Sequence, residues 1–511
     1  MNVWRGILTA CALSASAAAT GQGGPYENSV AIVTSYAQRP DFDAPWKKAP
    51  VRTDQHIGTL VAGPYLLVSA WAVGYSTHLE MNRFGDSRRE SLEVAFVDYT
   101  IGLALLRPVR PEAFAGMRPL ELGGDLRIGD QAELVASHEM ERSLVVPGRL
   151  SDINIDSVVT SSYNVTHYHF EVPGKSAFGK SEPLMKAGKL LGIAVAQADN
   201  DVYVMPSKVI RHFLNDRHDD GYRGFVRLGI SVKRLESPPL RAWLNATKFQ
   251  QGVLITHVQE SSPFAEKIRK NDILLKIGDM TVSKSGYYQH PLWGPMHFID
   301  RVAEYHGGDK VALTLVRDGR VVVVEEVVQR HFHNQEFIPD YRFKPEPHLI
   351  FGGLLFQELS TGFLSSWGAT WQKVAPLELV YLTTNSSGAK RDPTEKIIIL
   401  NRVLADDHNK GYQDFKNMVV EKVNGYPVHS MTQLEDSLRS PLIKNGIGLA
   451  RIEFRHGLGE VILAYDHLNE ANTRIARGYN ITTPDSFFKY PPDGVQGTHR
   501  PLPGPVVDPA L

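Results

Sequence analysis

Apolar runs of strand length recur from residue 25 to about residue 216, and turns rich in glycine, proline and polar residues separate them. The runs lie at residues 31–33, 58–62, 65–70, 92–97, 103–106, 131–135 and 190–195. Strands of this length and spacing are typical of β-sandwiches and β-barrels. The pattern therefore predicts an all-β first unit.

The second unit, residues 222–335, has a different order of elements. An apolar strand at residues 252–258 is followed by a Ser-Pro turn at residues 262–265 and by a second strand near residues 270–275. A later strand ends at Asp318-Gly319, a dipeptide typical of a two-residue hairpin turn. This order of strands and turns is similar to that of a PDZ domain, which implies an α+β unit.

The third unit, residues 345–485, repeats much of this order. A glycine-containing loop at its start is followed by a strand at residues 397–403, a strand with an Asn-Gly turn at residues 419–425, and a helix at residues 431–438. Two copies of one supersecondary unit strengthen both predictions. The last segment, residues 491–511, is rich in proline and glycine, which predicts a disordered tail.

Length and composition are those of a multidomain soluble protein. The chain has 511 residues, of which 42% are hydrophobic and 22% charged, and this length predicts three units of ordinary domain size. The formal net charge is −1, so no global field indicates binding to nucleic acid.

The N-terminus predicts export. Arg5 precedes an apolar, alanine-rich run that is too short to span a membrane, and small residues suited to cleavage lie at residues 15–19. Residues 1–19 are therefore predicted to be a signal peptide, and the protein to be periplasmic or extracellular. Cys11, the one cysteine of the chain, follows Leu8-Thr9-Ala10 in a run that resembles a bacterial lipobox, so a lipid anchor at Cys11 is the alternative.

Five segments together resemble the Deg/HtrA family of trypsin-like serine proteases. Residues 58–63 and 66–73 resemble the family's glycine-flanked strand followed by I-L-T-N-A-H-V-V. Residues 98–106 resemble its D-L-A-L-L segment, and residues 203–213 its last strand and closing helix. Residues 402–412 resemble a run in the second PDZ domain of the long Deg proteases first known from plants.

The resemblance implies a mainly β fold, with a trypsin-like double β-barrel at residues 25–216 followed by two PDZ-like α+β domains at residues 222–335 and 345–485. It also implies a role in protein quality control and a homo-oligomer, a trimer or a multiple of one.

Two of the three catalytic positions implied by the resemblance lack the required chemistry. The family's histidine falls on Trp71 and its aspartate on Gly102. A serine protease needs a base and a carboxylate that orients the base, but an indole only donates and glycine has no side chain. These replacements predict a degenerate, inactive protease domain.

The position of the nucleophile is open in the sequence. In place of the family's G-N-S-G-G-P stands Gly179-Lys180-Ser181-Glu182-Pro183. With one residue missing, the family's serine falls on Ser181; without a gap before Pro183 it falls on Lys180. A Ser/Lys dyad of the two neighbours is disfavoured because adjacent residues of extended backbone point apart. The rival hypothesis is an active serine endopeptidase that uses Ser181 with a non-standard base.

The PDZ-like loop Arg227, Leu228, Gly229 and Ile230 is the predicted binding site. Backbone N–H groups in such a loop bind a terminal carboxylate, and the peptide adds as a strand to the sheet edge. The predicted partners are peptide C-termini or unfolded proteins, and the predicted role is that of a scaffold, adaptor or chaperone-like factor. The loop at residues 351–356 of the third unit is a second, weaker candidate.

No cofactor or metal site is predicted. His167 and His169, and likewise His331 and His333, have a spacing that would suit a metal. Because no third ligand lies nearby in the sequence, both pairs are interpreted as surface histidines.

Overall fold

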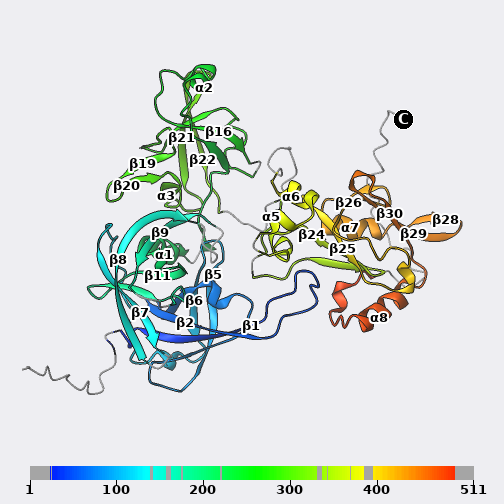
Figure 1. Cartoon of the computed structure of the whole chain (residues 1–511), viewed down its shortest axis with the longest axis horizontal. Coiled ribbons are helices and arrows are strands. Elements are labelled where there is room, and N and C mark those ends of the chain that lie inside the picture. Colours follow the sequence, from blue (N-terminus) through cyan, green and yellow to red (C-terminus); the bar gives the residue numbers. More distant parts are fainter. Residues whose placement is uncertain are drawn as a thin grey trace, which may run out of the picture.

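The computed structural model shows two β-barrels side by side and two further domains (Figure 1). It describes residues 24, 26–138, 142–156, 163–173, 177–218, 221–259, 261–330, 337–341, 343–368, 370–384 and 395–489. Within these residues, no helix is long and apolar enough to cross a membrane.

The first barrel is closed in the order β1-β2-β3-β6-β5-β4. Its strands are β1 (Val30–Ala37), β2 (Arg52–Val61), β3 (Tyr65–Ser69), β4 (Ser76–Asn82), β5 (Glu90–Asp98) and β6 (Leu103–Pro108). Short 3₁₀ helices follow β3 and β6, namely η1 (Ala70–Val73) and η2 (Pro111–Phe114). Side chains such as Val33, Leu66 and Leu106 fill the interior.

The second barrel is closed in the order β10-β11-β12-β9-β8-β7. Its strands are β7 (Gln131–His138), β8 (Arg142–Asp156), β9 (Val165–Glu171), β10 (Pro183–Lys186), β11 (Lys189–Ala198) and β12 (Asp201–Pro206). Helix α1 (Ser207–Asn215) then buries Val209, Ile210 and Phe213, whose spacing forms one apolar face. This face joins an apolar core shared by both barrels.

The first PDZ domain (PDZ1) lies above the barrels in Figure 1. Its sheet runs β15-β16-β17-β21-β22, with β18 beside β17. The bounds are β15 (Ile230–Lys233), α2 (Pro238–Trp243), β16 (Val253–Val258), β17 (Ile273–Ile277), β18 (Met280–Thr281), β19 (Tyr287–His290), β20 (Gly294–His297), α3 (Ile299–Val302), β21 (Lys310–Arg317) and β22 (Arg320–Val327). Asp318 and Gly319 have φ of 48° and 76°, as the predicted two-residue hairpin turn requires. Short strands β13 (Arg217–His218) and β14 (Gly221–Tyr222) precede the domain.

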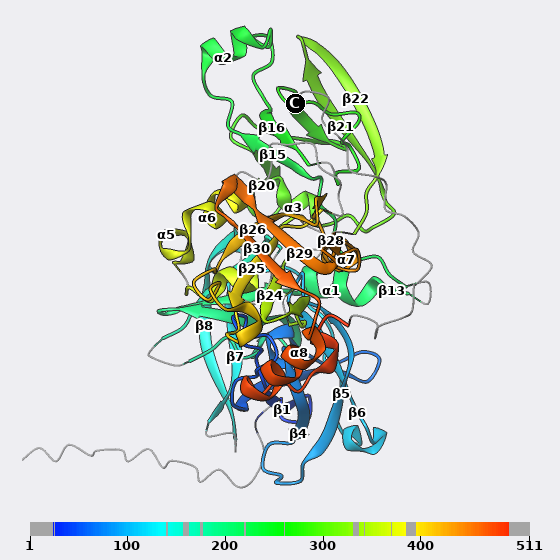
Figure 2. The same cartoon turned by 90° about the vertical axis from the view of Figure 1, so that its right-hand side faces the viewer.

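The second PDZ domain (PDZ2) has the sheet order β23-β24-β25-β26-β29-β28. Its elements are β23 (His348–Phe351), β24 (Leu354–Glu358), α4 (Thr361–Ser365), α5 (Trp371–Val374), α6 (Leu377–Thr384), β25 (Ile398–Val403), η5 (Asp407–Asn409), β26 (Met418–Val423), β27 (Tyr426–Pro427), α7 (Met431–Leu438), β28 (Leu442–Lys444), β29 (Ile447–Phe454), η6 (Arg455–Gly457), β30 (Glu460–Ala464), α8 (Leu468–Gly478) and η7 (Pro484–Ser486). Figure 2 shows α8 at the lower end of this domain.

The loop between β1 and β2 fastens PDZ2 to the first barrel. Phe42 O accepts a hydrogen bond from Gln357 Nε2 at 3.1 Å, and Asp43 O accepts one from Asn401 Nδ2 at 3.0 Å. The indole of Trp46 packs into an apolar cluster of PDZ2 and donates to Tyr479 O at 3.3 Å. Because this loop belongs to the first barrel, its contacts fix where PDZ2 sits.

The predicted fold class, a mainly β double barrel followed by two PDZ domains, is confirmed. The prediction that His167 and His169 are surface residues is wrong. His167 is fully buried and the side chain of His169 is 12% exposed, because β9 is a strand of a closed barrel and α3 of PDZ1 packs against it. His331 and His333 lie outside the described residues.

Candidate functional site

The three segments predicted to hold the catalytic positions converge between the barrels. Ser69, at the end of β3, donates its N–H to Ser181 Oγ at 2.9 Å. The next residue, Ala70, donates its N–H to Gly102 O at 2.8 Å. Trp71 follows in η1. The structure therefore brings Trp71, Gly102 and Ser181 close together. The three residues do not form a proton relay.

Trp71 takes part in an aromatic cluster instead of a proton relay. Its half-buried ring meets Phe343 edge-on, with ring centroids 5.6 Å apart, and the guanidinium of Arg39 lies 4.7 Å from its centroid. Tyr75 and Tyr99 contact the same phenylalanine, at 5.4 Å and 4.9 Å. Phe343 precedes β23 of PDZ2, so a segment distant in the sequence covers this side of the site.

Gly102 has a backbone conformation that disfavours a carboxylate side chain there. Its φ is +83°, in the region that glycine adopts without strain. Its N–H donates to Asp98 O at 2.9 Å. The neighbouring carboxylate of Asp98 is buried and accepts the N–H of Thr100 at 2.8 Å, so it serves the local turn.

Ser181 and Lys180 occupy opposite environments. Ser181 is fully buried and has a φ of +71°, a left-handed conformation more common for glycine. Lys180 is exposed. A glycine-like backbone at position 181 fits the alignment without a gap, in which a glycine of G-N-S-G-G-P falls on Ser181 and the serine falls on Lys180.

The backbone donors of the turn are all engaged. Phe178 N–H donates to Gln197 Oε1 at 2.6 Å. Gly179 and Lys180 N–H both donate to Glu182 Oε2, at 2.9 Å and 2.8 Å, and Ser181 N–H donates to Ala194 O at 2.9 Å. A trypsin-like oxyanion hole uses the N–H of the nucleophile and of the residue two positions before it. In either alignment both of these donors are bonded within the chain.

Glu182 is the residue that holds this turn closed. Its side chain is buried beneath the turn, and burial raises its pKa to about 7 although two N–H groups and Lys180 favour the charged form. The family alignment predicts a carboxylate that lies beside an oxyanion site and repels charge. In the structure, Glu182 Oε2 instead accepts the N–H groups of Gly179 and Lys180.

His56 on β2 is a buried histidine that the sequence patterns do not single out. Neither ring nitrogen has a hydrogen-bond partner among the described residues, and burial lowers its pKa to about 4. The next residue, Ile57, donates its N–H to Lys180 O at 2.9 Å. Ser181 Oγ, by contrast, has no hydrogen bond to any histidine, aspartate or glutamate side chain of the described chain.

The loop of PDZ1 keeps its N–H groups unused. Ser262 Oγ donates to Leu228 O at 2.6 Å, and Gln259 N–H donates to Gly229 O at 2.8 Å. In the part of the chain that the structure describes, neither Leu228 nor Gly229 donates its own N–H. Gly229 has a φ of +65°, and a Cβ there would lie 2.7 Å from Ser262 Cβ, so this position requires glycine.

The strand that follows this loop is open along one side. β15 is the edge strand of its sheet, and Ile230 is half-buried. Arg227 at the start of the loop lies over the ring of Tyr163 from the second barrel, with its guanidinium 5.4 Å from the centroid. The loop is thus anchored on the barrel while its strand edge stays available.

The corresponding loop of PDZ2 is closed by its own chain. Gly352 N–H donates to Asn472 Oδ1 from α8 at 3.2 Å, and Gly352 O accepts from Asn409 Nδ2 at 2.9 Å. Its strand β24 lies between β23 and β25, so both of its edges are paired. A peptide has no free edge to join on β24.

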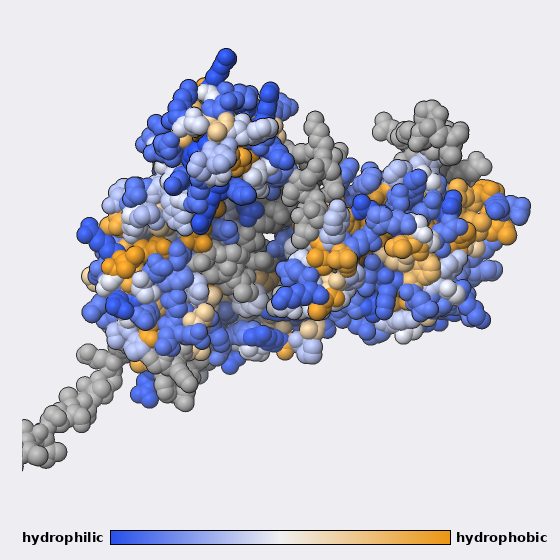
Figure 3. All heavy atoms as spheres, turned by 45° about the horizontal axis from the view of Figure 1, so that its top comes forward, coloured by the Kyte–Doolittle hydropathy of each residue, from blue (hydrophilic) through white to orange (hydrophobic). Residues whose placement is uncertain are grey.

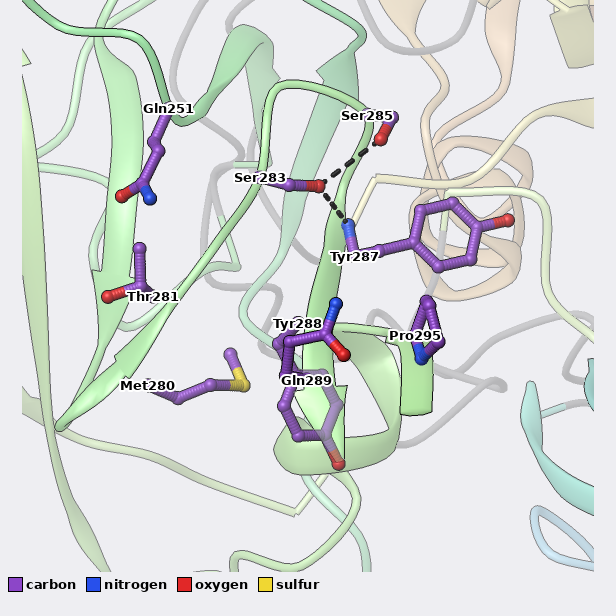
Figure 4. Close-up of a pocket in the computed structure, with 9 residues that line it drawn as sticks. All are labelled: Gln251, Met280, Thr281, Ser283, Ser285, Tyr287, Tyr288, Gln289 and Pro295. Atoms are coloured by element: carbon purple, nitrogen blue, oxygen red, sulfur yellow. Dashed lines mark hydrogen bonds between the residues drawn. The ribbon is translucent and has the colours of Figure 1, made fainter. Parts of the chain in front are cut away.

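A pocket of about 690 Å³ in PDZ1 is lined by none of the residues of these loops (Figure 4). Ser283 Oγ accepts the N–H of Tyr287 at 2.9 Å at its rim. The lining residues are Gln251, Met280, Thr281, Ser283, Ser285, Tyr287, Tyr288, Gln289 and Pro295. This lining contains no carboxylate, histidine or lysine, so it offers no acid–base pair.

Comparison with known proteins identifies the modules. Residues 226–326 and 338–487 each match a family model described as PDZ domain. Protease Do-like 2, chloroplastic, of Arabidopsis thaliana is 26% identical over 80% of this chain and 67% of that protein. Protease Do-like 4, mitochondrial, of the same plant is 24% identical over 90% and 85%. The chain belongs to the Deg/HtrA family.

Two further relatives of this family match a smaller part of the chain. The Serine protease DegP homolog of Plasmodium falciparum is 24% identical over 43% of this chain and 27% of its own length. Among solved structures, HtrA-type protease AlgW with decapeptide has a TM-score of 0.45 at 17% identity, covering 60% of this chain and 96% of that one. These relatives are named as proteases, and two Arabidopsis relatives are named as chloroplastic or mitochondrial.

Proposed function

We propose that this Deg/HtrA protein is a pseudoprotease that captures peptide C-termini or unfolded chains through PDZ1. The observation that carries the proposal is the contrast between two sets of N–H groups. Those of the turn at residues 178–181 are bonded within the chain. Those of Leu228 and Gly229 have no acceptor among the described residues, and they lie next to an open strand edge.

The missing base and the missing carboxylate of the triad support the absence of protease activity. Trp71 offers no acceptor for a proton and Gly102 no carboxylate. In subtilisin, loss of the catalytic histidine alone costs about 10⁶ in kcat, and loss of one oxyanion donor costs about 10²–10³. These losses fall on one catalytic step and leave a rate near that of the uncatalysed reaction.

The rival function, a serine endopeptidase that uses Ser181 with a non-standard base, has one feature in its favour. His56 is a buried imidazole on the strand that bonds to Lys180 O, and its low pKa keeps it neutral at pH 7. Against it, Ser181 is fully buried and its Oγ already accepts the N–H of Ser69.

A fluorophosphonate probe separates these two functions. We expect no labelling of the full chain, because the probe needs an activated, accessible serine. Ser181→Ala serves as the matched control, and an authentic trypsin-like protease as the positive control. Labelling of the parent that disappears in Ser181→Ala would establish the endopeptidase and refute the pseudoprotease.

PDZ1 has the geometry needed for strand addition. β15 is an edge strand, and half-buried apolar side chains packed against the core of this domain come from Ile230, Val232, Ile299 and Tyr305. An added peptide strand would gain backbone hydrogen bonds from the edge and bury its terminal side chain on these groups. The unused N–H groups of the loop then provide donors for the terminal carboxylate.

A peptide with a free apolar C-terminus should bind the full chain several-fold more tightly than its amidated twin. Charge-assisted hydrogen bonds contribute about 1.5–3 kcal/mol, and amidation removes the charge. Fluorescence anisotropy with the two labelled peptides measures the difference.

Ile230→Asp should weaken binding of the free-acid peptide by at least about 10-fold, because a carboxylate in the groove repels the terminal carboxylate. The matched control is Val323→Asp on β22, where the side chain is 60% exposed. Equal binding of both peptides, or an equal loss in both variants, would refute PDZ1 as a carboxylate site.

PDZ2 has a structural role in this proposal. Its loop is bonded to Asn472 and its domain is fastened by the loop around Trp46. The prediction that the loop at residues 351–356 could bind peptide is therefore set aside in favour of PDZ1.

Assembly and export complete the proposed function. Figure 3 shows an apolar patch on PDZ2, where Leu442, Ile443 and Ile447 are 39%, 71% and 43% exposed. Patches of this kind mark interfaces and support a homo-oligomer, which light scattering of the full chain tests.

Export stays a prediction because residues 1–23 lie outside the described residues. N-terminal sequencing of the mature protein tests both the signal peptide and Cys11.

A further inference from the structure

Helix α1 and PDZ1 bring together three side chains that can ligate a metal. His212 and Asp216 lie one turn apart at the end of α1, and His306 comes from the segment between α3 and β21. Their candidate ligand atoms all lie within 4.8 Å of one another. Among the described residues, this is the one group of three such side chains.

The two imidazoles stack on each other beside the carboxylate of Asp216. Their rings stack with centroids 3.7 Å apart at an angle of 18°, and the other face of His212 stacks on Phe225 at 4.2 Å. His306 Nδ1 lies 2.8 Å from Asp216 Oδ1. The second oxygen of Asp216 accepts the N–H of Gly224, so this carboxylate cannot turn away.

One nitrogen of this cluster lacks a partner. His212 Nε2 is buried and has no hydrogen-bond partner within the described chain. A buried polar atom without a partner carries a desolvation cost, and a bound ion is one way to offset that cost.

We propose that His212, Asp216 and His306 bind one divalent transition metal ion of the zinc class. Two imidazoles and one carboxylate are a ligand set typical of zinc, and water completes a tetrahedron in such three-residue sites. Bonds of about 2.0–2.1 Å place tetrahedral ligand atoms roughly 3.4 Å apart. The side chain of His306 is 27% exposed and is the ligand that can move inward.

The metal ties the last helix of the double barrel to PDZ1. When His306 binds through Nδ1, that nitrogen presents its lone pair to the metal, its hydrogen bond to Asp216 is given up, and the neutral ring carries its proton on Nε2. The metal therefore fixes PDZ1, and with it the loop at residues 227–230, against the barrel. Neither the vacant catalytic positions nor the peptide groove takes part, so this site is independent of the proposed peptide binding.

Calorimetric titration of the EDTA-treated full chain with Zn²⁺ tests the site. We expect one ion per chain, and His306→Ala should weaken its affinity by at least about 100-fold, since loss of an outer partner alone costs 10–100-fold. The matched control is His78→Ala, because His78 also lies beside a carboxylate, 3.7 Å from Glu80, and is exposed. Its affinity should equal that of the parent.

A second variant tests whether weaker binding by His306→Ala comes from the lost ligand or from misfolding. His306→Asn keeps a side chain that can donate to Asp216 while removing the imidazole ligand, and its circular dichroism should match the parent. Co²⁺ in place of Zn²⁺ should give the visible absorption of a tetrahedral nitrogen–oxygen site in the parent and lose it in His306→Asn. No zinc binding by the parent, unchanged affinity in both His306 variants, or an equal loss in His78→Ala would each overturn the proposal.

Discussion

Asp300→Ala should destabilise the chain by about 3–5 kcal/mol, the cost of removing one partner of a buried ion pair. Asp300 of PDZ1 is 1% exposed. It accepts hydrogen bonds from Thr166 Oγ1 on β9, from Lys208 Nζ on α1, and from Tyr288 Oη at 2.6 Å. The alanine variant leaves the ammonium of Lys208, whose side chain is 17% exposed, without its carboxylate.

Urea denaturation at neutral pH measures this loss. Asp279→Ala is the matched control, since Asp279 belongs to the same domain but its side chain is 93% exposed; we expect its effect to stay within about 0.5 kcal/mol. An Asp300→Ala midpoint equal to that of the control would contradict the role assigned to this ion pair.

The pH dependence gives a second test of Asp300. Burial alone would raise the pKa of this carboxyl, but Lys208 and the three hydrogen bonds hold the pKa below its ordinary value of 3.8. A depressed folded pKa contributes stability that is present above pH 3.8 and is lost as the pH falls through the folded pKa. The gap between parent and Asp300→Ala should therefore be constant at neutral pH and shrink below about pH 3.8.

Much of the fold was predictable because its determinants are local. Strands such as residues 103–106 and 190–195 are apolar on both sides, and Asp318-Gly319 specifies its hairpin through backbone conformation alone. The helix after Pro206 carries its buried residues on one face. Local patterns of this kind predict elements and their order, and the family resemblance then supplied their arrangement.

The candidate site was less predictable because its decisive contacts join residues far apart in the chain. Nothing near Trp71 in the sequence indicates that Phe343 packs on it, and Gln197 reaches the turn at Phe178 from the far end of β11. The same holds for His306, which meets Asp216 from 90 residues away. A spacing rule finds ligands on one strand or helix, whereas this cluster depends on how PDZ1 docks.

The variant with Trp71→His and Gly102→Asp should remain inactive on casein, although it restores the two missing side chains on paper. Position 102 has a φ of +83°, so an aspartate there costs of order 1–3 kcal/mol in backbone strain. A histidine at position 71 leaves the contacts of Trp71 with Phe343 and Arg39 unfilled. Neither substitution frees the N–H groups held by Glu182 and Gln197.

Activity should return only if the turn is rebuilt as well. G-N-S-G-G-P at residues 178–183 replaces Lys180 with the nucleophile, removes the carboxylate of Glu182, and supplies glycine where Ser181 has a φ of +71°. Freeing one oxyanion donor is worth about 10²–10³ in kcat, and the combined variant should cleave casein faster than either part alone. Fluorophosphonate labelling gives the same comparison independently of the substrate, with alanine at position 180 of the rebuilt turn as its control. Ready casein cleavage by the double variant alone, abolished by Ser181→Ala, would show that Ser181 is a competent nucleophile and that the closed turn opens on binding substrate.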